Sequence, residues 1–155
     1  MNLSRHVTIQ EFSYSPTAIK KGIHNVMNSI QVNNAIQLCE NVFEPLRKHL
    51  NAPIKISSGF RCEQLNKLIG GALNKLGASI SQHCKGEAFD LELTDRKLFD
   101  WIIKNLEFDQ AIYEFGNDTH ADWFHISYRK GNNRKQALRA IKIGGKTQYI
   151  PYKPL

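Results

Sequence analysis

Residues 81–90 read SQHCKGEAFD, and the strand that begins near the end of this stretch organises the expected fold. Phe89, Leu91 and Leu93 alternate with small or polar residues, a period of two that is typical of a strand with one buried face. Asp90 lies on the opposite face of that strand and therefore points away from the core. We expect this carboxylate to stand on an open surface of a sheet.

A histidine precedes the strand at a spacing that allows it to reach the same point. Gly86 and Ala88 lie between His83 and Asp90, and a small, glycine-containing stretch can curl back and bring the two side chains together. Imidazole nitrogens and carboxylate oxygens both bind zinc, at about 2.0–2.2 Å. Taken alone, each residue has a more ordinary explanation as a hydrogen-bonded or solvated polar side chain.

A second polar strand face supplies the remaining parts of a hydrolytic metal site. Such a site needs three protein ligands, an open position for water and a carboxylate that takes the proton of that water. The segment WFHISY, residues 123–128, alternates in the same way, and His125 lies on its polar face as a third ligand. Asp122, three residues earlier, is the favoured general base, and Glu114 on the preceding strand is the alternative.

The cysteines give little indication of a metal or disulfide role. Cys39, Cys62 and Cys84 are an odd number without a C-x-x-C pair, which argues against a disulfide framework and against a structural zinc knot. Cys84 adjoins His83, and a thiolate is a good zinc ligand. Adjacent residues of an extended chain point in opposite directions, however, so we expect Cys84 to pack rather than to bind metal.

The remaining segments predict helices and strands that do not alternate regularly. Residues 32–50 carry apolar side chains at helical spacing, and Pro45 predicts a kink late in that helix. Thr94 is the expected N-cap of a helix over residues 95–106. We also expect a strand ending in a turn at Ser58–Gly59, a helix over 61–71, strands over 110–115 and 123–128, and a hairpin over 137–152 turning at Gly144–Gly145. This order predicts a single α+β domain over residues 1–155, with a central antiparallel sheet flanked by helices.

Length, composition and charge limit the class of protein. The 155 residues suit one domain, and no apolar run approaches the roughly 20 residues of a membrane span, so we expect no membrane insertion. Lys and Arg outnumber Asp and Glu by 21 to 14, and the resulting charge of +7 would attract an anionic partner. Nucleic acid is a disfavoured partner, because only Tyr128 lies among the clustered basic residues, which are Arg129, Lys130, Arg134, Lys135, Arg139 and Lys142. The N-terminus shows neither a signal nor a transit pattern, which predicts cytoplasmic synthesis.

One multi-residue motif is specific enough to indicate a family. The pattern S-x-H-x-x-G-x-A-x-D is matched at every position from Ser81 to Asp90, and D-W-F-H follows at residues 122–125. These motifs resemble those of the zinc D-alanyl-D-alanine carboxypeptidases, a family that also holds vancomycin-resistance dipeptidases and phage L-alanyl-D-glutamate endolysins. The similarity extends over most of the chain and is greatest to small single-domain members of phages and prophages. It implies the Hedgehog/DD-peptidase-like fold.

The resemblance implies a role for each matched residue. Zinc would be held by His83, Asp90 and His125, and Asp122 would serve as the general base and acid. Arg61, in the SSGFR turn, would bind a substrate carboxylate or polarise the scissile carbonyl. A guanidinium suits that task because its planar fork meets a carboxylate in two parallel hydrogen bonds and keeps its proton.

Three further residues keep two interpretations each. Ser81 would hydrogen-bond beside a ligand or to substrate, or would only cap a turn. His120, five residues before His125, resembles a transition-state-stabilising histidine of some relatives, or is a plain loop residue. Trp123, on the face of His125, would line the substrate groove or belong to the core.

The resemblance therefore implies a zinc-dependent peptidase that cleaves the peptide stems of bacterial peptidoglycan, of D,D-carboxypeptidase or endopeptidase (endolysin) type. Peptidoglycan is anionic, in keeping with the charge of +7. The alternative is a catalytically silent relative that binds cell wall, or assembles in a phage particle, and keeps the zinc fold. A chain made in the cytoplasm would reach the wall through phage lysis machinery or in a virion, or would act on soluble precursors. The sequence leaves the cleaved bond open, and we expect a monomer.

Overall fold

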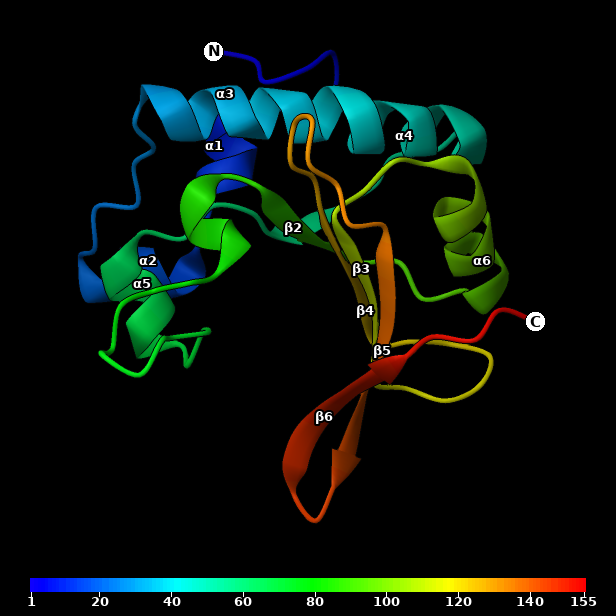
Figure 1. The fold of residues 1–155 in the computed structure, drawn as a ribbon. Coiled ribbons are helices and arrows are strands. Elements are labelled where there is room, and N and C mark those ends of the chain that lie inside the picture. Colours follow the sequence, from blue (N-terminus) through cyan, green and yellow to red (C-terminus); the bar gives the residue numbers. More distant parts are fainter.

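A six-stranded sheet organises the fold, with its strands in the order β1-β2-β4-β3-β5-β6 (Figure 1). The computed structural model describes all 155 residues, Met1–Leu155. The strands are β1 (Ile56–Ser58), β2 (Ala88–Leu91), β3 (Gln110–Glu114), β4 (Trp123–Ser127), β5 (Gln136–Ile143) and β6 (Lys146–Pro151). Every neighbouring pair is antiparallel except β3 and β5, which are parallel. The predicted α+β class is confirmed, and the sheet is antiparallel as predicted except between β3 and β5.

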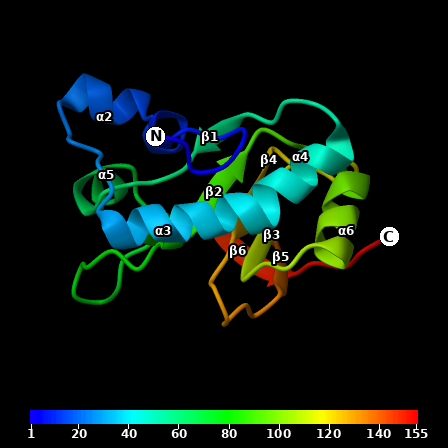
Figure 2. The same ribbon diagram turned by 90° about the horizontal axis from the view of Figure 1, so that it is seen from above.

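Helices cover one face of this sheet. Viewed from above, α3 and α4 form one rod that crosses the sheet, and α6 lies beside one end of that rod (Figure 2). The helical elements are α1 (Ile9–Ser13), α2 (Pro16–Lys21), α3 (Ser29–Leu38), the π-helical turn η1 (Cys39–Phe43), α4 (Glu44–Leu50), α5 (Glu63–Leu68), the 3-10 turn η2 (Gln82–Lys85) and α6 (Arg96–Asn105). None of these helices has the length and apolar character that would let it cross a membrane.

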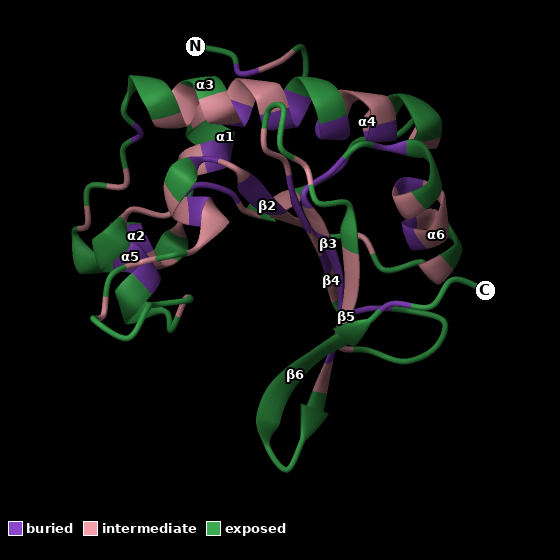
Figure 3. Cartoon of the chain, viewed as in Figure 1, coloured by how far each residue is buried: buried purple, intermediate pink, exposed green.

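The core lies between the helices and the covered face of the sheet, and buried positions follow the inner strands and the undersides of the helices (Figure 3). Phe89 and Leu91 of β2 are fully buried, as the period of two predicts. Phe43 meets Phe89 edge to face, with their ring centroids 6.1 Å apart. Phe99 of α6 packs edge to face against Phe124 of β4. Because these apolar residues occupy one face, the polar residues that alternate with them must emerge on the other.

The predicted kink at Pro45 is replaced by a wider turn. Residues 29–50 form one continuous rod, and η1 ends two residues before the proline. Its hydrogen bond from the Glu44 N–H reaches back five residues to the Cys39 carbonyl. A proline has no N–H and its ring clashes with the carbonyl four residues earlier, so widening the turn relieves the conflict without bending the helix away from the core.

The N-cap of α6 is Asp95, and the prediction of Thr94 is wrong by one position. The Asp95 carboxylate accepts a hydrogen bond from the Lys97 N–H at 2.9 Å. Thr94 is still part of an extended segment, because its carbonyl accepts a hydrogen bond from the Ala121 N–H. The helix therefore begins only after this pairing has ended. The predicted hairpin of β5 and β6, with its turn at Gly144–Gly145, is confirmed.

Candidate metal centre

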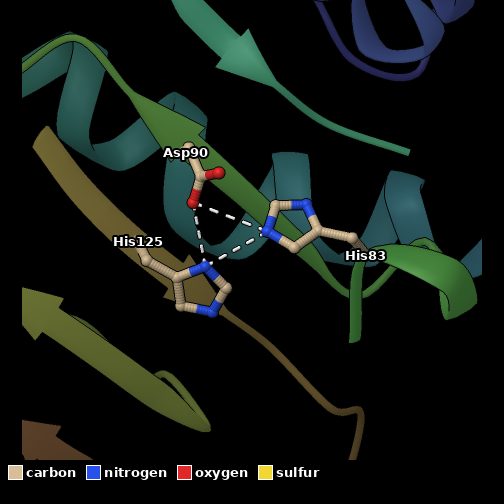
Figure 4. A group of neighbouring side chains, drawn as sticks. All are labelled: His83, Asp90 and His125. Atoms are coloured by element: carbon tan, nitrogen blue, oxygen red, sulfur yellow. Dashed lines mark hydrogen bonds and ion pairs between the residues drawn. The ribbon is translucent and has the colours of Figure 1, made fainter. Parts of the chain in front are cut away.

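Three side chains converge on the open face of the sheet (Figure 4). His83 Nε2 lies 3.2 Å from His125 Nδ1, and His125 Nδ1 lies 2.9 Å from Asp90 Oδ1. His83 Nε2 is 3.5 Å from the same carboxylate oxygen. Two nitrogens and one oxygen, each able to act as a metal ligand, therefore face one point.

Strand register brings two of these groups together. Asp90 of β2 and His125 of β4 are directly opposite one another in the antiparallel ladder. Directly opposed residues point to the same face with their Cβ atoms about 4.5–5.5 Å apart, so a carboxylate and an imidazole at these positions meet. The alternation that buries Phe89 and Phe124 in the core is the same alternation that presents Asp90 and His125 on the open face.

The third group arrives on the short turn η2. Ser81 caps this turn, its hydroxyl accepting a hydrogen bond from the His83 N–H at 3.3 Å. Gly86 ends the turn in the left-handed region at φ 72°, and a Cβ there would collide with the Gln31 carbonyl of α3. A glycine is therefore required twice over, for its backbone conformation and for the close approach of the helix.

A backbone carbonyl sets the tautomer of His83. Its Nδ1 lies 2.7 Å from the Gly59 carbonyl oxygen, and only a protonated nitrogen can donate there. Nε2 is then left with a free lone pair that points at Asp90 and His125. Gly59 itself packs tightly against α1, where a Cβ would collide with the Phe12 carbonyl.

The spacing of the three atoms fits a tetrahedral ion. Ligands about 2.0–2.1 Å from a tetrahedral zinc lie roughly 3.3–3.4 Å from one another, by simple geometry. The observed separations of 2.9, 3.2 and 3.5 Å bracket that value. A set of two histidines and one carboxylate is typical of catalytic zinc, which keeps its fourth position open.

The charges of the ligands suit a cation as well. Burial alone would raise the pKa of Asp90, but His83 and His125 outweigh it and hold that pKa well below its usual range. Burial lowers the pKa of His83, against the opposing charge of Asp90, and the ring is only 2% exposed. A carboxylate that stays ionised and an imidazole that stays neutral are the protonation states that metal binding requires.

The three ligands lie in a cleft of about 1090 Å³. Arg61 borders it, with a side chain 14% exposed and its Nη2 3.9 Å from Asp90 Oδ2. Its Nε is buried and has no hydrogen-bond partner in the protein. Burial lowers the pKa of this guanidinium, although Asp90 opposes the shift. The cleft is thus bordered by a cation beside the three ligands.

The structure separates the two candidate bases. Glu114 of β3 lines the cleft, is 6% exposed, and has its pKa raised to about 7 by burial, with His125 lowering it and Asp90 raising it. Asp122 precedes the first residue of β4, is exposed, and lines a neighbouring hollow that shares Phe115 and Trp123 with the cleft but contains none of the three ligands. Only its backbone N–H meets Glu114, through the Glu114 carbonyl at 2.8 Å.

The other sequence candidates are divided in the same way. Trp123 lines the cleft, and Ser81 does so as well as capping η2. His120 is exposed on the loop before β4, where its Nδ1 lies 3.0 Å from the Thr119 hydroxyl. The structure therefore brings Trp123 and Ser81 to the ligands and leaves His120 outside.

The match to a family model covers most of the chain, since residues 5–127 fit the model of peptidase M15. The chain belongs to the peptidase M15 family. No curated protein matches it. In this M15 family member the matched range includes the three ligands, Arg61 and Glu114, and it ends with β4. Family and site together support a metallopeptidase, with a His–Asp–His group that could hold the metal.

Several residues at or beside the site of this M15 family member had no sequence signal. The Gly59 carbonyl acts through the backbone, which no residue pattern reveals. In the sequence, Arg129 and Arg134 belong to a cluster of basic residues with no assigned role, yet both border the cleft. Tyr149 reaches it from β6, far along the chain from the ligands. Only the fact that Tyr149 is an aromatic residue on a predicted strand could have pointed to it.

Proposed function

We propose that this M15 family member is a zinc-dependent peptidase that hydrolyses the peptide stems of bacterial peptidoglycan. The observation that carries the proposal is the convergence of His83, Asp90 and His125 in a cleft that also contains Glu114 and Arg61. Zinc, when bound by the three ligands, supplies a Lewis acid that polarises the scissile carbonyl and lowers the pKa of water toward about 7.

Glu114 is the general base in this proposal, in place of Asp122. A base works best when its pKa is close to the working pH, and burial raises the pKa of Glu114 to about 7. It stands diagonally across the ladder from His125, because Ile112 is the direct partner of His125 and Trp123 that of Glu114. Diagonal neighbours are about 7–8 Å apart, which leaves room for a water between carboxylate and ligand.

Arg61 binds the substrate. Its guanidinium is mostly buried at the border of the cleft, and a cation in that position gains most from an anionic or strongly polar group that pairs with it. A peptide carboxylate or the oxygen of the scissile carbonyl provides such a group. Because Arg61 also lies close to Asp90, the bound group would sit beside the ligands.

The charge of the cleft border supports an anionic substrate. Lys85 and Arg129 join Arg61 in lining the cleft, as do Arg134, which is paired with Asp109, and the acidic Glu87; the whole chain carries +7. Such a field raises the local concentration of an anionic polymer. Peptidoglycan, with its acidic stem peptides, fits this field better than a neutral peptide does.

Incubation with defined muropeptides tests the function. Zinc-loaded protein should release a fragment detectable by mass, and chelator should abolish the release. Variants His83→Ala and His125→Ala should lose both bound zinc and activity, whereas Gln148→Ala, on an exposed strand position, should keep both. The mass of the fragment distinguishes a D,D-carboxypeptidase from an endopeptidase. Zinc binding without hydrolysis of any muropeptide would instead support a silent cell-wall-binding or phage structural protein.

A further inference from the structure

The hairpin of β5 and β6 contributes to the cleft although it lies beyond the residues matched to the M15 family, 5–127. Gln136 and Leu138 of β5 and Tyr149 of β6 all line it. The hairpin extends away from the helical layer (Figure 1), and every residue of β6 is exposed. An exposed strand that still lines the cleft is placed to touch whatever the cleft holds.

Cross-strand register orders the open face into two rows. The first, the ligand row, runs from β2 to β5 through directly paired residues: Asp90, His125, Ile112 and Leu138. The second, the carboxylate row, runs from β4 to β6 in the same way: Trp123, Glu114, Ala140 and Tyr149. Directly paired residues share a face, so Tyr149 stands on the same surface as Glu114.

Only a small residue separates Tyr149 from Glu114. Ala140 lies between them in the carboxylate row, and a methyl group raises no barrier between the two larger side chains. Partial burial of its phenol raises the pKa of Tyr149 although the residue as a whole is exposed, and the charges of Glu114 and Asp90 raise it further, which accords with this proximity. The phenol is therefore protonated at neutral pH and can donate a hydrogen bond.

The cleft has a direction across the strands. Arg61 follows β1 at one end of the strand order, the ligands Asp90 and His125 lie on β2 and β4, and the hairpin stands at the other end. A peptide whose carboxylate rests on Arg61 and whose scissile bond lies at the ligands must continue toward β5 and β6. That continuation is the part of the peptide on the N-terminal side of the bond.

We propose that the C-terminal hairpin forms the wall that recognises the peptide on the N-terminal side of the scissile bond, with Tyr149 as its specificity-determining residue. This inference rests on the proposed function. Tyr149 contacts the peptide through its ring and donates a hydrogen bond from its phenol. Leu138 supplies apolar surface at the end of the ligand row.

The test uses zinc-loaded protein and N-acetylated peptides that share one cleaved bond and lengthen residue by residue on its N-terminal side. Tyr149→Ala should raise KM about tenfold for the longer peptides and leave the shortest within twofold, because a lost contact of about 1.4 kcal/mol is a tenfold effect. Tyr149→Phe keeps the ring and should therefore recover the part of the affinity that the ring provides. The matched control is Gln148→Ala, since adjacent strand residues point to opposite faces.

A second measurement separates this inference from the proposed function. Calorimetry with a reduced-amide analogue of the longest peptide reports binding without hydrolysis, and Tyr149→Ala should weaken it about tenfold. If the wild type hydrolyses the peptides while Tyr149→Ala has unchanged KM and unchanged binding, the role of the hairpin is wrong and the proposed peptidase activity stands. An equal loss in Gln148→Ala would also overturn the role of the hairpin. If Tyr149→Ala binds the analogue more weakly but the wild type hydrolyses no peptide, the peptide-binding role of the hairpin is supported and the proposed peptidase activity is wrong.

Discussion

At the scale of single residues, the position of a carboxylate decides whether it can act at the site. Glu114 and Asp122 are both carboxylates close to His125 in the sequence or in the ladder, yet one is buried in the cleft and the other is exposed outside it. Burial raises the pKa of Glu114 to about 7, which suits the role of general base proposed for it. Asp122 lines a hollow separate from the ligands.

Substitution of the two carboxylates should separate them. Glu114→Gln should lower kcat by about 10²–10⁴-fold, the usual contribution of a general base, while zinc remains bound. Asp122→Asn, a matched change outside the cleft, should leave kcat within about threefold. Steady-state kinetics and metal analysis of both variants provide the check. The reverse pattern would return the role to Asp122.

The raised pKa of Glu114 also predicts a change in stability with pH for the metal-free protein. The folded carboxyl has a pKa of about 7 against an ordinary value of 4.5, so the folded state binds more protons between these values. Stability is thus fully present below about pH 4.5 and is lost as the pH rises through about 7. Glu114→Gln escapes this loss. Its advantage over the wild type should grow from near zero at pH 4.5 to about 2–3 kcal/mol at pH 8. Urea unfolding in the presence of chelator measures both, and a constant difference would contradict the assignment.

At the scale of elements, η2 is the part that positions His83. It is held by its Ser81 cap, by the Gln31 side chain, which donates to the Cys84 carbonyl at 2.9 Å, and by the close approach of α3 to Gly86. The helix α3 therefore affects the position of His83 indirectly, through its contacts with the backbone of η2. A shift of η2 would move the His83 ring away from Asp90.

A substitution at Gly86 should show this coupling. Gly86→Ala meets both an unfavourable left-handed φ and the Gln31 carbonyl, so it should cost about 2–4 kcal/mol and weaken zinc affinity. Gly131→Ala is the matched control, since Gly131 has φ 73° but open space where a Cβ would stand. It should cost only about 1–2 kcal/mol and leave zinc affinity unchanged. Thermal unfolding and zinc titration distinguish the two, and equal zinc affinity in both would disprove the coupling.

At the scale of the whole molecule, charge and shape act together. The sheet presents its open face between the η2 turn and the projecting hairpin, and basic residues border the cleft there. The net charge of +7 belongs to the whole chain, and its electric field attracts anionic polymers from a distance. A short neutral peptide would not be drawn in this way.

Salt should therefore affect the two kinds of substrate differently. Raising the ionic strength from about 0.05 to 0.5 M shortens the screening length well below 10 Å, and hydrolysis of intact peptidoglycan should fall several-fold. Hydrolysis of a short neutral peptide should stay within about twofold. Turbidity loss of purified cell walls and chromatography of the peptide provide the two rates. If both rates declined in parallel, salt would be acting on the site itself and not on the long-range attraction of the polymer.

Sequence alone determined the strands, the α+β class and the face on which Asp90 and His125 stand, because the alternation of apolar and polar residues is a local property of the chain. The placement of Glu114 inside the cleft and of Asp122 outside it, the contact of the Gly59 carbonyl with His83, and the position of Tyr149 at the cleft were decided only by tertiary structure. Each follows from strand register or from packing between segments far apart in the chain.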